Sequence, residues 1–298
     1  MGKKFPNLFI FIGKTQILKK YTKIVKNLSL KHVKYLIKFQ GVKMLFKDIA
    51  RILKEVPYMS NLEGKVVYDF IRRSGFQNIL ELGFAHGTST CYFAAAIEEN
   101  GSGLITTMDN QLAKDRKPNI FALLNKTKLS RYVKPIFADS SYTWELMKII
   151  ENQTIRGVCK PQFDFCFLDG AHTWEVDGLT FFLVEKLLKP GGWILFDDLE
   201  WSFAQSPSLQ NSKVVQKMPE DQKTTPQVKK VFSLLVCQHQ NFENIKIFND
   251  WGWAQKRTRT KNESTMKSQK IINKMYSRQI FKSNIDKIFK KIKRFLKS

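Results

Sequence analysis

One stretch decides the fold of this 298-residue chain: Ile79-Leu80-Glu81-Leu82-Gly83-Phe84-Ala85-His86-Gly87-Thr88-Ser89-Thr90. An apolar run ends in an acidic side chain, two glycines follow, and small hydroxyl residues come next. This order predicts a buried strand, a tight turn and the first turn of a helix. Glycines let the backbone approach a ligand, and the N–H groups of a helix N-terminus attract negative groups. Parallel α/β sheets commonly hold a nucleotide-like cofactor at such a turn, although the same spacing also occurs where a helix simply packs tightly on a sheet.

A second acidic residue favours the cofactor interpretation. The apolar segment 104–108 ends in Asp109, which lies 22 residues after Gly87. Rossmann-like sites place an acidic side chain at the end of the second strand, about 20 residues on, to accept hydrogen bonds from ribose hydroxyls. The alternative is an ordinary turn residue before Asn110. The position of Asp109 at a strand end favours the ribose role.

The chain between about residues 56 and 256 alternates between strand-like and helical segments. Apolar runs predict parallel strands at 78–83, 104–109, 133–139, 163–169 and 192–197, with helices at 88–99, 118–128, 142–152 and 175–188. A polar loop at 203–225, a helix at 226–238 and a hairpin at 244–249 and 252–256 follow. Apolar strands that alternate with helices are typical of a parallel sheet covered on both faces. The expected fold is therefore α/β, a Rossmann-like, seven-stranded and mostly parallel sheet with a C-terminal antiparallel hairpin, flanked by basic helical arms.

Carboxylates end the fourth and fifth predicted strands. The fourth ends in Asp169-Gly170-Ala171-His172, and the fifth ends in Asp197-Asp198. The C-terminal ends of parallel strands share one edge, so Asp169, Asp197 and Asp198 should converge there. Three carboxylates brought together raise one another's pKa values, and a hard divalent cation such as Mg²⁺ removes that conflict. The alternative is that Asp198 caps a helix and Asp197 is solvated.

Composition indicates a globular protein with two basic arms. Hydrophobic residues make up 43% of the chain, including 24 Phe, and the formal net charge is +24. Residues 1–55 contain 14 Lys or Arg and two acidic residues, and residues 255–298 contain 15 and two, so the segment between them is nearly neutral. We predict three parts: a basic amphipathic helical arm (1–55), a catalytic-looking domain (56–256) and a basic tail with an amphipathic helix (257–298).

The cellular location follows from cysteine usage and apolar run length. The four cysteines are scattered, with no C-x-x-C pair, which predicts reduced core thiols in a cytoplasmic protein. The early apolar run Leu8 to Ile12 is far shorter than the ~20 residues that span a bilayer. In the tail, apolar side chains from Phe281 to Leu296 recur on one helical face among lysines, which favours peripheral contact with an anionic membrane at its inner face. A solvated lysine-rich helix is the alternative.

The sequence resembles the class I S-adenosylmethionine (SAM)-dependent methyltransferases over roughly residues 56–256. The run Glu81-Leu82-Gly83-Phe84-Ala85-His86-Gly87-Thr88-Ser89 is most similar to the E-L-G-x-x-x-G-x-S form of the metal-dependent O-methyltransferases, the group of catechol O-methyltransferase and of macrolide-sugar and cephalosporin-cluster enzymes. The resemblance implies a SAM cofactor and a divalent cation, Mg²⁺ or another. It also implies an acceptor hydroxyl on a small molecule or a glycan. The acceptor itself, the required metal and the oligomeric state are not implied.

The resemblance also assigns roles by position. Glu81, Gly83 and Gly87 would shape the cofactor pocket, Ser89 would hold the methionine carboxylate and Asp109 the ribose. Asp139 and Ser140, which end the third strand, would lie beside the adenine. Asp169, Asp197 and Asp198 fall on the metal-ligand positions, although the last is often Asn in the catechol enzymes. His172 occupies the place where those enzymes carry a lysine base.

These roles imply a mechanism in which a cation favours ionisation of the acceptor hydroxyl and His172, with an ordinary pKa of ~6.5, accepts the proton. The oxygen then attacks the sulfonium methyl group in line. His172 has a plainer alternative as a hydrogen-bonding residue at a helix start. Trp174 and Trp201 flank the expected site as candidates for stacking on an acceptor ring or as core aromatics.

Two other functions compete with this one. A nucleic-acid methyltransferase would explain the basic arms through phosphate contacts. However, adenine- and cytosine-N-methylating enzymes usually carry Asn/Asp-Pro-Pro-aromatic after the fourth strand, where this chain has Asp169-Gly170-Ala171-His172. A non-catalytic, membrane-associated binding protein with the same fold is the other competitor. The intact set of acidic positions disfavours it.

Overall fold

The computed structural model describes residues 45–207, 209 and 212–258. Of the predicted N-terminal arm, these residues include helix α3 (Phe46–Leu53); the rest of that arm and the predicted tail helix lie outside them. The chain divides into two compact units. The first holds the helices that precede β1, α5 and α6, and the second holds the sheet, apart from the first two residues of β2 and of β3. Within the described part of the chain, no helix is both long enough and apolar enough to cross a membrane.

The first unit is helical. Its helices are α3, α4 (Asn61–Ser74), α5 (Thr88–Asn100) and α6 (Ile120–Thr127). A capping box starts α4: Ser60 Oγ accepts from the N–H of Glu63, and the Glu63 carboxylate accepts from the N–H of Ser60. Side chains are buried on all sides of α5 from Thr88 to Glu98. A helix buried on every side belongs to the core of its unit.

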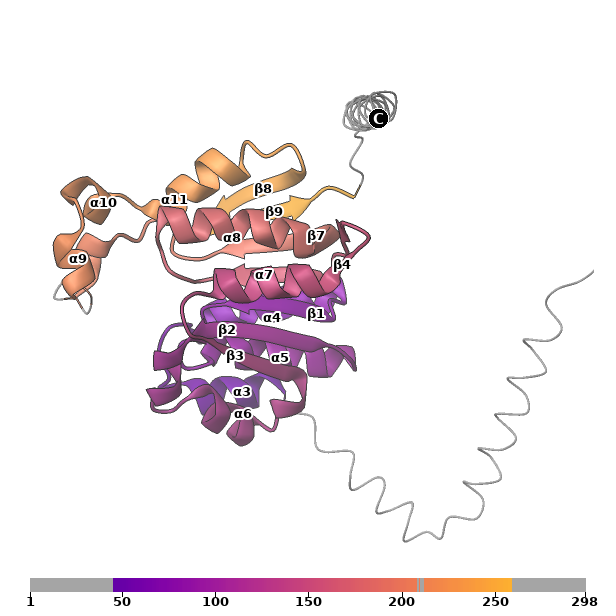
Figure 1. Cartoon of the computed structure of the whole chain (residues 1–298). Coiled ribbons are helices and arrows are strands. Elements are labelled where there is room, and N and C mark those ends of the chain that lie inside the picture. Colours follow the sequence, from indigo (N-terminus) through magenta and orange to yellow (C-terminus); the bar gives the residue numbers. More distant parts are fainter. Residues whose placement is uncertain (1–44, 208, 210–211, 259–298) are drawn as a thin grey trace, which may run out of the picture. The chain divides into compact units, whose positions relative to one another are not determined.

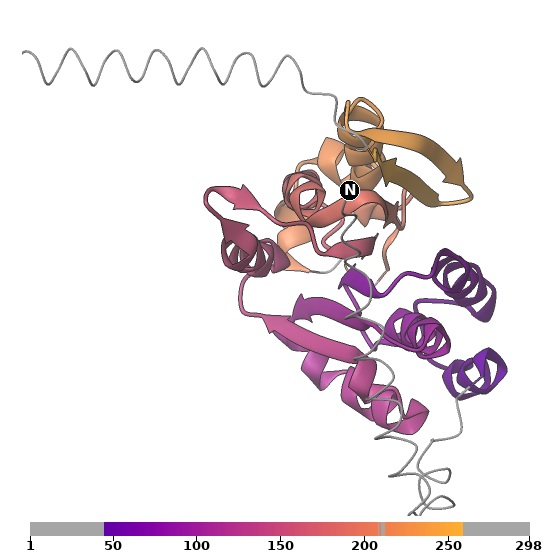
Figure 2. The same ribbon diagram turned by 90° about the vertical axis from the view of Figure 1, so that its right-hand side faces the viewer.

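The second unit is built on a seven-stranded sheet of order β3-β2-β1-β6-β7-β9-β8. The strands are β1 (Asn78–Leu82), β2 (Leu104–Asn110), β3 (Val133–Ala138), β6 (Phe163–Leu168), β7 (Leu188–Phe196), β8 (Phe242–Phe248) and β9 (Trp251–Lys256). β6 pairs in parallel with β1 and β7, whereas β9 is antiparallel to β7 and β8. Figure 2 shows β8 and β9 as a twisted two-stranded ribbon. The predicted seven-stranded, mostly parallel sheet with a C-terminal hairpin is confirmed.

Helices α7 (Tyr142–Gln153), α8 (Trp174–Leu187) and α11 (Gln227–Val231) share one apolar core with this sheet. Figure 1 shows α7 and α8 side by side against the strands. Leu82 and Leu168 on the strands and Phe181 on α8 are fully or almost fully buried in that core. In the register of the sheet, Leu82 pairs with Leu168 and Leu168 with Phe196. The residues that follow β1, β6 and β7 therefore emerge at the same edge.

Several local features differ from the expectations. β7 begins at Leu188, four residues early, because Leu188 pairs with Phe163 before a register shift that resumes pairing at Trp193. The short hairpin β4 (Thr154–Ile155) and β5 (Val158–Cys159) was not predicted. The predicted helix 226–238 is α11 followed by a π-helical turn, η4 (Phe232–Val236).

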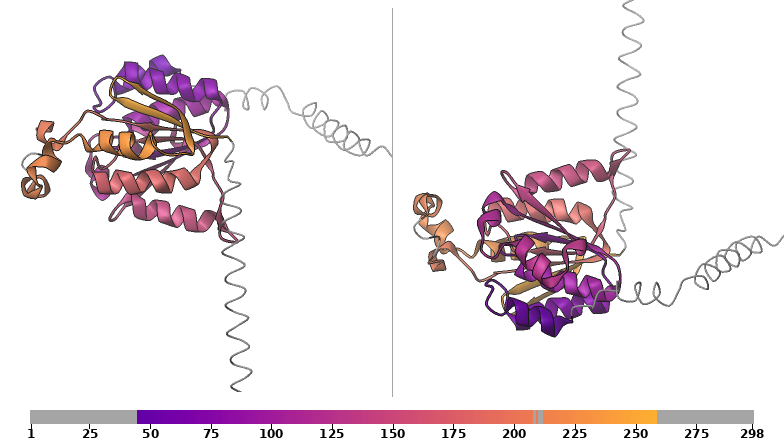
Figure 3. Two further views of the ribbon diagram at one scale, coloured as in Figure 1. Left: turned by 90° about the horizontal axis from the view of Figure 1, so that it is seen from above. Right: turned by 90° about the horizontal axis from the view of Figure 1, so that it is seen from below.

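The predicted polar loop 203–225 contains short helices. They are η3 (Phe203–Gln205), α9 (Lys213–Lys217) and α10 (Glu220–Thr224). The two α-helices project away from α8 and α11 (Figures 1 and 3). One-turn helices of this length carry too little hydrophobic periodicity to be recognised in a polar stretch.

Candidate functional site

The acidic residues predicted to converge do leave the sheet at one edge. Asp169 follows β6 and its N–H donates to the carbonyl of Leu82 at 2.9 Å; Asp197 follows β7 and its N–H donates to the carbonyl of Leu168 at 3.0 Å. These bonds continue the parallel ladders by one residue. Asp198 comes next in the chain. The strand register thus places the carboxylates where a ligand can be shared between neighbouring strands.

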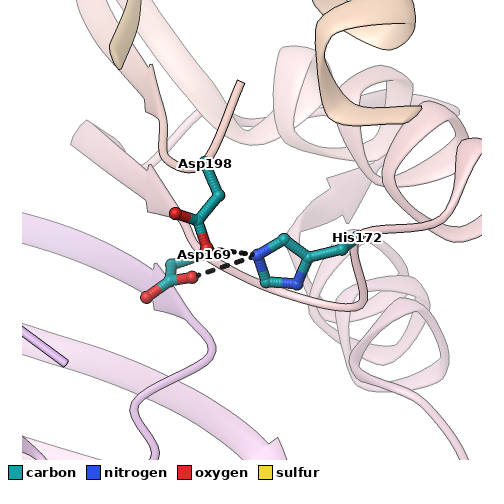
Figure 4. Close-up of side chains that lie close together, drawn as sticks. All are labelled: Asp169, His172 and Asp198. Carbon is teal, nitrogen blue, oxygen red and sulfur yellow. Dashed lines mark hydrogen bonds and ion pairs between the residues drawn. The ribbon is translucent and has the colours of Figure 1, made fainter. Parts of the chain in front are cut away.

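Three side chains form a compact group at this edge: Asp169, His172 and Asp198 (Figure 4). The His172 Nε2 atom lies 2.9 Å from Asp198 Oδ2 and 3.5 Å from Asp169 Oδ1. One donor atom from each residue lies within 4.8 Å of the other two. Among the described residues, this is the group of His, Cys, Asp and Glu side chains with a spacing suited to a metal ion.

The backbone is bent to bring these side chains together. His172 has φ +56° and Asp198 has φ +57°, both in the left-handed region. Histidine and aspartate are enriched there relative to most other side chains, but each such residue still costs of order 1–3 kcal/mol. Strain of this kind persists where the surrounding structure holds it, and it gathers at functional sites.

Asp197 is held differently from its neighbours. Its Oδ1 accepts hydrogen bonds from the indole Nε1 of Trp251 at 2.7 Å and from the backbone N–H of Asp198 at 2.8 Å. Asp197 lies outside the three-residue group, although its charge acts on Asp169. No sequence pattern connects Trp251 with this edge, because the contact depends on β9 pairing beside β7.

Burial and neighbouring charges shift the pKa values of Asp169 and His172. Burial raises the pKa of Asp169 well above its usual range, and the charges of Asp197 and Asp198 raise it further. Burial lowers the pKa of His172, but the hydrogen bond that its imidazole donates to Asp198 and the charge of Asp169 outweigh burial and raise the pKa to about 9. This pKa favours the protonated imidazole at neutral pH. The expectation that it accepts a proton with an ordinary pKa does not apply to this state.

Two tryptophans were expected to flank the site. The Trp201 ring lies 4.7 Å from the His172 ring and 4.8 Å from the Phe203 ring, centroid to centroid. Trp174 begins α8, is 39% exposed, and donates its backbone N–H to Gln227 Oε1 at 2.7 Å. Trp201 thus packs directly on the candidate base His172. Trp174 lies two residues after His172 in the sequence and is partly exposed.

In the second unit, the predicted cofactor residues Glu81 and Asp109 accept hydrogen bonds from residues on neighbouring segments. Glu81 is fully buried and accepts from Thr107 Oγ1 at 2.6 Å. Asp109 Oδ2 accepts from the N–H of Phe84 at 3.0 Å. Asp109 therefore already holds the loop that follows β1. Thr107 is a supporting residue that the sequence did not single out.

Asp139 and Ser140 follow β3 and are exposed. Asp139 Oδ1 accepts from Gln111 Nε2 at 2.7 Å, and the same amide donates to the carbonyl of Phe137 at 2.9 Å. Gln111 links the end of β2 to the end of β3. It was missed because its partners lie 26 and 28 residues away in the sequence.

In the first unit, the glycine loop enters α5. Gly87 is the N-cap, with φ +93°, and has no side chain to accept from the first N–H groups of the helix. A methyl group at Gly87 would lie 2.8 Å from Ile120 Cγ1, so the position needs glycine for space as well as for conformation. Ser89 lies in the first turn and is 7% exposed. Such a helix end suits an anionic group.

Neighbouring side chains hold this loop in place. His86 Nδ1 lies 2.6 Å from the carbonyl oxygen of Pro118, and its ring stacks on that of Tyr58 with centroids 5.6 Å apart. Thr88 Oγ1 donates to the carbonyl of Pro57 at 2.9 Å. Ala85 has φ +46°, in the left-handed region that non-glycine residues rarely adopt. No role was predicted for His86, although its position between Gly83 and Gly87 could have drawn attention to it.

Comparison with known proteins agrees with the fold. Residues 80–199 match a family model described as a methyltransferase domain. Comparison with curated protein sequences gives no significant match. The SAH-bound methyltransferase PaMTH1 of Podospora anserina is similar in structure, with 17% identity over 87% of this chain and 100% of that one, and a TM-score of 0.51. An O-methyltransferase of Bacillus cereus, solved with SAH, has 19% identity over 71% and 90%, and a TM-score of 0.49.

Proposed function

We propose that this chain, whose residues 80–199 match a model of a methyltransferase domain, is a class I SAM-dependent methyltransferase that methylates a hydroxyl oxygen with the assistance of a divalent cation. The observation that carries the proposal is the group of Asp169, His172 and Asp198 at the carboxyl ends of β6 and β7. Methyl transfer to a hydroxyl requires loss of a proton. A set of carboxylates and an imidazole at the strand ends suits that task.

The donor set fits a divalent cation. The atoms of the group that includes the Asp169 and Asp198 carboxylates lie within 4.8 Å of one another, a spacing that lets both carboxylates reach one octahedral ion with bonds of about 2.1 Å. The raised pKa of Asp169 reflects burial and the charges of Asp197 and Asp198, and a cation removes the repulsion among them. Carboxylate oxygens favour hard divalent cations such as Mg²⁺ or Mn²⁺.

We assign Asp169 and Asp198 as ligands, with Asp197 as a third. When bound, the cation would make the acceptor hydroxyl easier to ionise. His172 would accept the proton: a cation offsets the carboxylate charges that keep the imidazole protonated, while its burial, which favours the neutral ring, remains. Trp201, packed on His172, would bound the space for the acceptor.

The cofactor residues are assigned by position in the motif. We propose that Glu81, Gly83 and Gly87 shape the pocket for SAM and that Ser89 holds the methionine carboxylate at the start of α5. Asp109 would bind the ribose, with Asp139 and Ser140 beside the adenine. The buried Glu81–Thr107 hydrogen bond and the αL conformation of Gly87 support a loop that is rigid before the cofactor binds.

The acceptor is proposed as a small molecule or a glycan with a free hydroxyl. The basic arms, most of which lie outside the described residues, favour attachment to an anionic membrane surface, where each Lys or Arg gains about 1 kcal/mol. A lipid-linked or envelope glycan would suit such attachment. This part of the proposal rests on the sequence of the arms alone.

The test is transfer of a radiolabelled methyl group from SAM to a panel of phenols, catechols and sugars. We expect transfer with Mg²⁺ or Mn²⁺, loss with EDTA and recovery when the metal is restored. Asp169→Ala should lose transfer but still bind SAH in calorimetry. Asp115→Ala, at an exposed position outside the site, is the control. Transfer that survives chelation would show the metal assignment to be wrong.

A further inference from the structure

Two buried polar side chains contact the loop that carries Asp169 and His172. Tyr142 begins α7 and is 8% exposed, and Asp177 lies in α8 and is 0% exposed. The Tyr142 hydroxyl donates to Asp177 Oδ1 at 2.5 Å and accepts from the N–H of Ala171 at 2.9 Å. A single hydroxyl thus connects α8 to the middle of the loop.

The loop is shaped to receive this hydroxyl. A methyl group on Gly170 would lie 2.2 Å from the Tyr142 oxygen. Gly170 has no positive φ, so glycine is required here for space and not for backbone conformation. The Asp169-Gly170-Ala171-His172 sequence therefore leaves one face of the loop open to Tyr142.

The arrangement costs stability. Asp177 Oδ2 is buried without a hydrogen-bond partner among the described residues, and burial raises the pKa of the Asp177 carboxyl. Apolar side chains of similar volume often replace buried charged groups without loss of stability. A polar pair kept in this position therefore points to a task other than packing.

The residue after Ala171, His172, is the one whose backbone needs support. His172 holds a left-handed backbone, which persists only when its surroundings fix it, and the preceding N–H is the one that Tyr142 binds. We propose that Tyr142 and Asp177 are positioning residues that fix the Asp169 and His172 side chains at the candidate site. The expected effect of this positioning on the binding of a divalent cation rests on the proposed function.

The main variant is Tyr142→Phe in the full-length chain, and Tyr92→Phe is its matched control. Tyr92 is also fully buried, and its hydroxyl donates to Asn61 Oδ1 at 2.5 Å. Residues that orient ligands from behind typically contribute 10–100-fold to metal affinity. Calorimetry with Mn²⁺ should therefore show affinity at least about tenfold weaker in Tyr142→Phe and unchanged in Tyr92→Phe. Urea unfolding of both variants confirms that they remain folded and measures any difference in stability.

Asp177 provides a rescue comparison. Asp177→Asn keeps a side-chain oxygen that can accept from the Tyr142 hydroxyl, whereas Asp177→Ala removes it. We expect Asp177→Ala to lose Mn²⁺ affinity as Tyr142→Phe does, and Asp177→Asn to retain most of it. Equal losses in both Asp177 variants would overturn the role of the hydrogen bond.

A second readout needs no metal. The chain has four histidines, so the ¹H–¹⁵N ring signals of His172 can be assigned by their loss in His172→Gln. At one fixed pH, these signals should move in Tyr142→Phe and stay in place in Tyr92→Phe. If the wild type binds no Mn²⁺ but the signals move as expected, the metal assignment fails and the positioning role stands. If the Mn²⁺ affinity and the signals of Tyr142→Phe both match the wild type, the positioning role is wrong.

Discussion

Gly83 lies so close to the carbonyl group of Asp169 that a methyl group added to Gly83 would sit 1.7 Å from the Asp169 oxygen. The first residue of the glycine loop and the first candidate metal ligand are thus in backbone contact. The contact follows from the pairing of β1 with β6, since the Asp169 N–H also donates to Leu82, which precedes Gly83. The motif glycine therefore serves the site on the neighbouring strand as well as its own turn.

Gly83→Ala should be strongly destabilising. Gly83 has φ +88°, and its methyl group would collide with backbone that cannot move without breaking the strand pairing. Gly75→Ala is the control, because Gly75 has φ +67° but open space around it. Left-handed alanine alone costs about 1–2 kcal/mol, so Gly75→Ala should lose about that much free energy of unfolding in urea. Gly83→Ala should lose clearly more or fail to fold, and equal losses would contradict the close contact.

The pH dependence of stability should show the protonated His172. Its pKa is about 9 in the folded chain against an ordinary 6.5, so folding binds this proton more tightly. The resulting stabilisation is fully present below pH 6.5 and is lost as the pH rises to about 9. In EDTA, the urea midpoint of the wild type should fall over this window, and His172→Gln should show a smaller fall. Parallel curves for the two proteins would argue against the His172 interaction with Asp198 and Asp169.

Asp109→Ala should weaken binding of the cofactor product SAH. Loss of a charged acceptor costs roughly 1.5–3 kcal/mol per hydrogen bond, which corresponds to about tenfold or more in affinity. The SAH affinity of Asp109→Asn should lie between those of the wild type and Asp109→Ala, since an amide oxygen can still accept from the N–H of Phe84. Calorimetry with SAH checks this, with Asp115→Ala at an exposed position as the control. Wild-type affinity in Asp109→Ala would remove the ribose assignment.

Deletion of residues 278–298 should reduce cosedimentation with anionic liposomes. The removed segment carries apolar side chains on one face of a predicted helix, with lysines around them, and such helices bind anionic surfaces. Neutral liposomes and high salt serve as controls, because both remove the electrostatic part of the attraction. Unchanged cosedimentation of the truncated chain would remove this attachment site from the proposal.

The sequence predicted the strands well because each is a short apolar run that ends in a polar or small residue. β1, β2, β3 and β6 begin where expected, at residues 78, 104, 133 and 163. It predicted β7 less well, since Leu188 joins the strand through a register shift that only its partner Phe163 defines. The hairpin β4–β5 contributes two residues to each strand, too few for any periodicity.

The residues of the candidate site were predictable from the sequence, but most of their contacts were not. Asp169, Asp197 and Asp198 were foreseeable because the ends of parallel strands share an edge. Their individual roles were not: Trp251 holds Asp197, while His172 contacts Asp169 and Asp198. These contacts join residues from separate strands and loops. No local pattern encodes them.

The sequence by itself determined the main strands and helices and the seven-stranded α/β sheet, because hydrophobic periodicity and the glycine motif act over a few neighbouring residues. Only the tertiary structure decided which side chains of the site contact one another and how their pKa values shift. Burial and the closeness of three carboxylates set the pKa values of Asp169 and His172, and both depend on distances between strands. Tyr142 and Asp177 became visible for the same reason, since the partners of the Tyr142 hydroxyl lie 29 and 35 residues away in the chain.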